Sequence, residues 1–158
     1  MSKKSKYIIL TIIWMGFIFC MSNQPANISK ELSQNIENLL NNTPIIGNLL
    51  SDILNSPNSQ FIVRKSAHII LFCFLSILCF VVIYELKRNV KISTLASFSI
   101  TFIYACMDEI HQLFIPGRSG KINDVLIDSI GAIIGLIVIN LIFMLKNKSK
   151  KLYSKNIQ

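Results

Sequence analysis

The chain has 158 residues, of which 52% are hydrophobic and only 15% charged, and its formal net charge is +8. Soluble domains carry about 25% charged residues, so this composition argues against a freely soluble globular protein, and its apolar content argues against disorder. The length suggests one domain over residues 1–158, with room for about four membrane spans. The basic residues cluster beside apolar runs, as in membrane proteins, so no nucleic-acid partner is expected.

Four apolar runs predict four membrane-spanning helices, over residues 7–22, 66–84, 92–108 and 125–145. As a helix, the first run is about 22 Å long, which is short for a hydrocarbon core of about 30 Å. A cleaved signal peptide is therefore an alternative, but no A-x-A-like cleavage site follows the run, and an uncleaved span is preferred. The expected fold is all-α, a small bundle of four transmembrane helices in contact with the lipid bilayer.

The connection between the first two spans is polar, yet it contains two apolar stripes with helical spacing. The stripes consist of Leu32, Ile36, Leu39 and Leu40, and of Ile45, Ile46, Leu49, Leu50, Ile53 and Leu54. Thr43 and Pro44 are expected to be the N-cap and the first residue of the second helix. Both stretches are too short to span a bilayer, so we expect amphipathic helices that lie on the membrane surface or over the bundle.

The distribution of Lys and Arg predicts the orientation of the chain in the membrane. Eleven of the 16 basic residues flank the spans on the side of the two termini, and five lie in the connections on the opposite side. Because positive residues are retained on the cytoplasmic side, both termini, with the basic tail 146–158, are assigned to the cytoplasm of a cell-membrane protein. Residues 64–68 and 108–128 then share the extracytoplasmic side.

That extracytoplasmic side gathers ionisable residues at the ends of three spans. Such groups are costly at membrane depth and usually mark a functional site, so we expect them to converge in one polar pocket. Structural ion pairs that only fix the helix ends are the alternative. The candidate ligand-binding residues are Arg64, Lys65, His68, Asp108, Glu109, His111, Gln112, Arg118, Asp124 and Asp128.

The fourth span indicates how its two acids point. Asp124, Asp128, Gly131 and Gly135 lie on one stripe of the expected helix. Small residues at a four-residue spacing let two helices approach closely. Both aspartates are therefore expected to face the bundle rather than the lipid.

Several chemistries can be weighed from the motifs. The sequence has no G-x-S-x-G, no P-loop and no recognisable nucleophile context, so no catalytic residue is predicted. The four basic residues Arg64, Lys65, Arg118 and Lys121 could clamp the phosphate of an anionic lipid head group. Two histidines and four carboxylates could hold a divalent metal, but their spacing matches no standard motif, and neither a metal nor a cofactor is expected. The four cysteines form no CxxC pair and are expected to be free thiols.

The same segments resemble the signatures of the VanZ-like membrane proteins. These segments are RKSAH at 64–68, DEIHQLFIPGR at 108–118 and NDVLIDSIG at 123–131, and SNQP at 22–25 is similar to the S-x-Q-P of that family. The resemblance covers nearly the whole chain and implies a multi-pass membrane topology. The family takes its name from an accessory protein of glycopeptide-antibiotic clusters that lowers susceptibility to teicoplanin, so a role in antibiotic tolerance is only loosely implied. The resemblance names no catalytic residue.

Three functions from different classes fit these observations. The preferred hypothesis is a non-enzymatic protein that binds an anionic cell-envelope component, such as the head group of a lipid-linked cell-wall precursor, or an envelope protein acting on one. The first alternative is a membrane-embedded hydrolase or transferase acting on a lipid head group, with His68 or His111 as acid–base residue. The second is a structural membrane subunit whose polar cluster only locks helices together. The sequence leaves open whether the protein is an enzyme.

Overall fold

The computed structural model describes residues 2–155, and this part of the chain is helical and contains no strand. The elements are α1 (Lys3–Ser22), α2 (Ala26–Asn41), α3 (Pro44–Leu49), α4 (Ser51–Leu54), α5 (Ser59–Lys87), α6 (Val90–Gln112) and α7 (Ile122–Lys155). Helices α1, α5, α6 and α7 are long and apolar enough to cross a membrane. The all-α expectation is confirmed, and each predicted span lies within one of these four helices.

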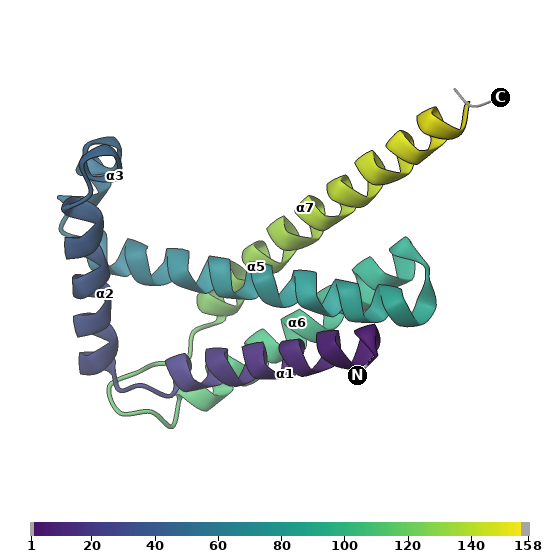
Figure 1. Ribbon diagram of the computed structural model, residues 1–158. Coiled ribbons are helices and arrows are strands. Elements are labelled where there is room, and N and C mark those ends of the chain that lie inside the picture. Colours follow the sequence, from purple (N-terminus) through teal and green to yellow (C-terminus); the bar gives the residue numbers. More distant parts are fainter. Residues whose placement is uncertain (1, 156–158) are drawn as a thin grey trace.

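Helix α5 lies at the centre of the arrangement and contacts α1, α2, α4, α6 and α7 (Figure 1). Helix α7 packs along α5 from Asp124, which pairs with Lys65, to Phe143, whose ring centre lies 4.6 Å from that of Tyr84. Its later part extends beyond the other helices toward the C-terminus (Figure 1). It continues to Lys155, so the described part of the predicted basic tail is helical, in keeping with the helix propensity of Lys and Leu. Residues 156–158 of that predicted tail lie outside the described residues.

Two glycines allow α7 to pack directly on the backbone of α5. A Cβ atom added at Gly131 would collide with the carbonyl oxygen of Ile69, and one added at Gly135 would collide with that of Cys73. The predicted close approach is therefore present. It turns the same face of α7 inward, so that Asp128 is only 1% exposed.

Helix α1 is fixed to the bundle by two side chains that donate to backbone carbonyls. Trp14 Nε1 donates to the carbonyl oxygen of Leu71 on α5 at 3.0 Å, and the hydroxyl of Tyr104 on α6 donates to that of Met15 at 2.6 Å. The main apolar core lies between these helices and consists of Ile18, Phe72, Leu75, Cys79 and Ala105. This packing fixes where the C-terminal end of α1 lies relative to α5 and α6. The four cysteines are free, as expected.

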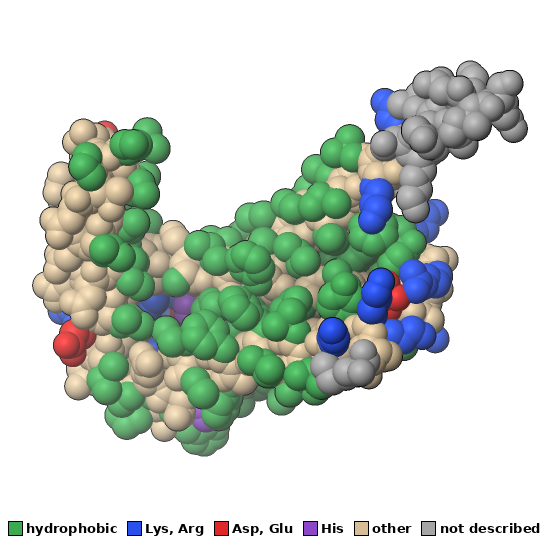
Figure 2. Space-filling view, viewed as in Figure 1, with side chains coloured by type: hydrophobic (Ala, Val, Ile, Leu, Met, Phe, Trp, Pro, Cys, Tyr) green, Lys and Arg blue, Asp and Glu red, His purple; other side chains and the backbone are tan. Residues whose placement is uncertain are grey.

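The connection between α1 and α5 forms an arm that stands across one end of the long helices (Figure 1). Apolar side chains gather on the side of this arm toward which the long helices extend (Figure 2). Among the apolar side chains of α2 and α3, Leu39, Ile45 and Leu49 are exposed by 69%, 82% and 81%. Such a face suits the boundary between head groups and acyl chains, as the amphipathic pattern predicts.

Two details of the arm differ from the expectation. The apolar stretch 45–54 forms two short helices instead of one, because Leu50 has φ −106° and ψ 12°, outside the regular α-helical values. Thr43 is the N-cap residue of α3, with Pro44 in the first turn, but its hydroxyl donates to the carbonyl oxygen of Leu39 at 3.0 Å. That hydroxyl satisfies a free carbonyl in the last turn of α2 and caps no N–H group of α3.

Basic side chains gather at the opposite end of the long helices, around the start of α1, the turn between α5 and α6, and the later part of α7 (Figure 2). Lys87, Arg88 and Lys91 are exposed there. The uneven distribution of Lys and Arg along the sequence is thus also an uneven distribution between the two ends of the bundle.

Candidate functional site

The candidate site lies at the end of the bundle where α1 ends, α5 begins, α6 ends and α7 begins. This end holds a cavity of about 330 Å³, which we call the basic pocket. Its charged lining comes from the start of α5, the loop 113–121 and the start of α7. The lining includes Arg64, Lys65, His68, Arg118, Lys121 and Asp124.

Lys65 and Asp124 form an ion pair between the second turn of α5 and the first turn of α7. Lys65 Nζ lies 2.6 Å from Asp124 Oδ2, and the two side chains are only 14% and 17% exposed. The ammonium group also lies 5.4 Å from the ring centre of Phe61. A basic residue of α5 therefore contacts an acid of α7 directly.

One turn deeper, His68 on α5 meets Asp128 on α7. His68 Nδ1 lies 3.2 Å from Asp128 Oδ1. His68 lines the basic pocket, whereas Asp128 lies behind it with 1% of its side chain exposed. The face shared by Asp124, Asp128 and Gly131 thus brings both acids of α7 against α5.

The two acids of α6 are buried and accept hydrogen bonds from neutral donors. Asp108 Oδ2 accepts from Ser22 Oγ and from Gln112 Nε2, both at 2.9 Å. Glu109 accepts from Gln112 Nε2 at 3.1 Å and from the backbone N–H of Lys121 at 2.9 Å. The carboxylates therefore hold the ends of α1, α6 and the loop 113–121 together without using a basic side chain.

Arg118 extends from the loop 113–121 over the end of α1. Its Nε donates to the carbonyl oxygen of Gln24 at 2.9 Å, and its Nη1 donates to Gln112 Oε1 at 3.3 Å. Burial lowers the pKa of the Arg118 guanidinium, and the nearby charge of Arg64 acts in the same direction. The ordinary pKa of arginine is so high that the group stays charged. Its contacts are neutral acceptors, so the charge remains available to the pocket.

A glycine in the loop lets the chain turn back toward α2. Gly117 has a φ of 73°, in the left-handed region that favours glycine. Just before it, the carbonyl oxygen of Pro116 accepts from the backbone N–H of Ala26 at 3.2 Å. This contact joins the loop to the start of α2 and closes one side of the basic pocket, which Ala26 and Gly117 also line.

The balance of contacts bears on the alternative that ion pairs only fix the helix ends. Among the described side chains at this end, Lys65 and Asp124 form the one ion pair between a Lys or Arg and a carboxylate, beside the contact of His68 with Asp128. Arg64, Arg118 and Lys121 make none within residues 2–155. Most of the carboxylates and most of the basic side chains therefore have neutral partners or none. This arrangement differs from a network in which the opposite charges neutralise one another.

The structure brings nine of the ten candidate residues together and leaves His111 apart. His111 Nε2 lies 3.1 Å from Asn23 Oδ1, and its ring centre lies 4.6 Å from that of Phe19 on α1. His111 therefore faces α1 and does not line the basic pocket. Ser22, which the candidate set omits, binds Asp108 directly. The signal that could have found Ser22 is its place in the SNQP segment, at the same end of the bundle.

The comparisons with known proteins identify the family of the chain. No curated protein and no solved structure shows a significant match to the chain. The family model described as VanZ/LLP1 matches residues 7–144, which include all ten candidate residues and most of each of the four long helices. With four helices able to cross a bilayer and this match over most of its length, the chain is a multi-pass membrane protein that belongs to the VanZ/LLP1 family.

Proposed function

We propose that this VanZ/LLP1-family protein binds an anionic component of the cell envelope in the basic pocket. The ligand class is a phosphate or diphosphate head group, as carried by a lipid-linked cell-wall precursor. The carrying observation is the pocket wall, where four basic side chains meet only one carboxylate, and that carboxylate is already paired with Lys65.

The arrangement of the buried acids supports this proposal. Asp108 and Glu109 accept from neutral donors, so they fix the frame of the site without neutralising Arg64, Arg118 or Lys121. Guanidinium and ammonium groups spread over an open wall match a phosphate, which accepts charge-assisted hydrogen bonds from several sides. The cavity of about 330 Å³ has room for such a head group.

The surroundings of the pocket favour a lipid-linked ligand over a free one. The amphipathic arm of α2 and α3 adjoins the pocket through Ala26, and its exposed apolar side chains suit the membrane surface. A diphosphate on a polyprenyl chain lies at that same depth. With the termini assigned to the cytoplasm, the pocket faces the outer leaflet, where an exported precursor is found.

Binding of a polyprenyl diphosphate to the purified protein in detergent micelles tests the proposal. Arg64→Gln removes a charge from the wall but no hydrogen bond or ion pair to a described residue, so the variant is expected to fold. We expect its affinity to fall at least about tenfold, because a charge-assisted hydrogen bond contributes about 1.5–3 kcal/mol. Arg88→Gln, at the opposite end of the bundle, is the matched control and should bind like the parent protein.

Two further ligands separate head-group recognition from partition of the tail. Inorganic diphosphate should compete with the polyprenyl diphosphate, and the uncharged polyprenol should bind much more weakly. Equal binding of the polyprenol and its diphosphate, or equal affinities of Arg64→Gln and Arg88→Gln, would contradict the proposal.

A role in glycopeptide tolerance follows if the bound component is the precursor that these antibiotics target. Expression of the protein in a susceptible host should then raise the minimum inhibitory concentration of teicoplanin, and Arg64→Gln should abolish the increase. An increase that survives in Arg64→Gln would place tolerance outside the basic pocket.

A further inference from the structure

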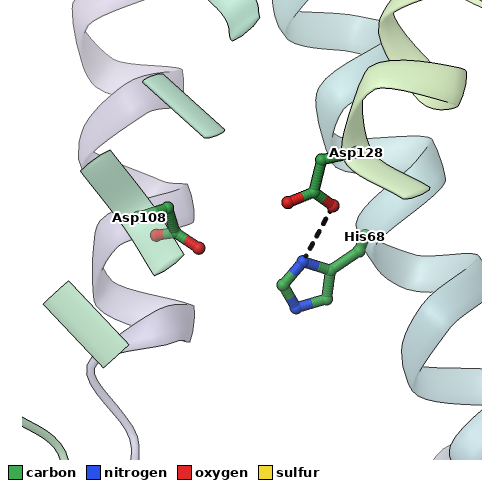
Figure 3. A group of neighbouring side chains, drawn as sticks. All are labelled: His68, Asp108 and Asp128. Atoms are coloured by element: carbon green, nitrogen blue, oxygen red, sulfur yellow. Dashed lines mark hydrogen bonds and ion pairs between the residues drawn. The ribbon is translucent and has the colours of Figure 1, made fainter. Parts of the chain in front are cut away.

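Behind the basic pocket, three side chains from three different helices point toward one another (Figure 3). They are His68 on α5, Asp108 on α6 and Asp128 on α7. One possible ligand atom from each residue lies within 4.8 Å of the other two. Both aspartates are buried, with 4% and 1% of their surfaces exposed.

The carboxylate of Asp128 is left with an oxygen that has no partner. Its Oδ1 is hydrogen-bonded to His68, but its buried Oδ2 has no hydrogen-bond donor in the described part of the chain. Figure 3 shows this free oxygen directed toward Asp108. An unpaired carboxylate oxygen out of reach of water is costly, and a second carboxylate opposite it adds repulsion. A cation between the two acids would remove both costs.

The hydrogen bonds of Asp108 leave one of its carboxylate oxygens available to a cation. Ser22 Oγ and Gln112 Nε2 both donate to its Oδ2, and no described group donates to its Oδ1. Hydrogen bonds of this kind commonly orient a metal-binding carboxylate from outside. The second oxygen of Asp108 is therefore free for a ligand.

We propose that His68, Asp108 and Asp128 bind one divalent cation of the Zn²⁺ or Mn²⁺ class. One imidazole nitrogen and two carboxylate oxygens suit these ions better than Ca²⁺ or Mg²⁺, which prefer all-oxygen sites. A tetrahedral zinc site sets its donor atoms roughly 3.4 Å apart, so small side-chain rotations close the group around the ion. Because His68 also lines the basic pocket, the cation would lie next to that cavity. The cation site goes beyond the proposed anion binding and does not depend on it.

Metal titration of the full-length chain in detergent tests this site. The protein is stripped with a chelator and then titrated with ZnCl₂ or with MnCl₂, while bound metal is counted by mass spectrometry. We expect one equivalent per chain in the parent protein and its loss in Asp128→Asn and Asp108→Asn. Asparagine keeps an oxygen that can accept from Ser22 and Gln112, so Asp108→Asn removes charge with little change of frame. Bound cation should also raise the Tm of the parent protein but not that of either variant.

Two substitutions of the same residue types outside the group are the controls. His111→Gln and Asp52→Asn, the latter on the exposed surface of α4, should keep one equivalent of metal. Stoichiometric binding that persists in Asp128→Asn, or no binding by the parent protein, would overturn the proposal. Arg64→Gln should bind the cation normally, so a failure of the metal site and a failure of the anion pocket give different results.

Discussion

Gln112 accepts a hydrogen bond from Arg118 through its Oε1 while its Nε2 donates to Asp108 and Glu109. One amide therefore connects two buried carboxylates with a guanidinium that they do not touch. Because the amide places a neutral group between the charges, the acids fix the position of Arg118 without taking up its charge. This arrangement gives the basic pocket a rigid wall that is still positive.

The amide of Gln112 gives a first prediction for stability. Gln112→Leu removes three hydrogen bonds in a buried position, all of them to charged groups. Each such bond contributes about 1.5–3 kcal/mol, and some are replaced by water, so we expect a net loss of at least about 2 kcal/mol. Thermal unfolding of the purified protein measures it. Gln34→Leu, on the exposed surface of α2, is the control and should unfold like the parent protein.

The inward face of α7 shows how far the sequence could predict this site. Helical periodicity alone places Asp124, Asp128 and Gly131 on one stripe, and a stripe with small residues and acids has to face other helices. The structure confirms that inference through the contacts of Gly131 with α5 and of Asp124 with Lys65. The helical period of the sequence and the cost of exposing acids to lipid were therefore sufficient to predict which face of α7 points inward.

Contacts between distant segments could not be read in the same way. Ser22 and Asp108 are 86 residues apart, and their hydrogen bond depends on where α1 ends relative to α6. The prediction that His111 lies in the pocket was wrong for the same reason, although His111 shares a helix face with Asp108. That side of α6 is divided between α1 and the basic pocket, and no pattern within α6 shows where the division lies. The trio His68, Asp108 and Asp128 likewise has no local spacing that marks it as a metal motif.

The contact of Gly131 with α5 gives a second prediction. Gly131→Ala places a Cβ atom against the carbonyl oxygen of Ile69 and forces α5 and α7 apart. We expect a loss of stability on the order of 1–3 kcal/mol, together with weaker anion binding, because the starts of α5 and α7 line the same pocket. Gly16→Ala in α1 is the matched control, since nothing lies within 4 Å of an added Cβ there. It should be neutral or stabilising by up to about 1 kcal/mol. A greater loss in Gly16→Ala than in Gly131→Ala would contradict the packing.

A third prediction concerns the orientation of the chain in the cell membrane. In a variant without its four native cysteines, Asn38→Cys on α2 should react with a membrane-impermeant maleimide in intact cells. Arg88→Cys, in the turn between α5 and α6, should react only after the cells are permeabilised. Both positions are exposed, so burial does not decide the result. The reverse pattern would put the basic pocket on the cytoplasmic side and would contradict an outer-leaflet ligand.

The fourth prediction concerns the ion pair of Lys65 and Asp124, and a double-mutant cycle isolates its contribution. The pair joins α5 to α7 at 2.6 Å with both side chains largely buried, so each charge is poorly screened by water. We expect a coupling energy of about 1–3 kcal/mol between Lys65→Met and Asp124→Asn, which is the upper part of the range found for contacting residues in one network. Because a lone buried charge is costly, the losses of stability in the two single variants should add up to more than the loss in the double variant.

The exposed pair of Arg88 and Glu85 is the control for this cycle. Arg88 is 63% exposed, so its pairing with Glu85 is screened, and the coupling between Arg88→Met and Glu85→Gln should stay below about 1 kcal/mol. Unfolding free energies from denaturant titrations supply the four corners of each cycle. If both cycles gave the same small coupling, Lys65 would not be held by Asp124 and its charge would be free in the pocket. The larger coupling at Lys65 instead leaves Arg64, Arg118 and Lys121 as the charges that an anion meets.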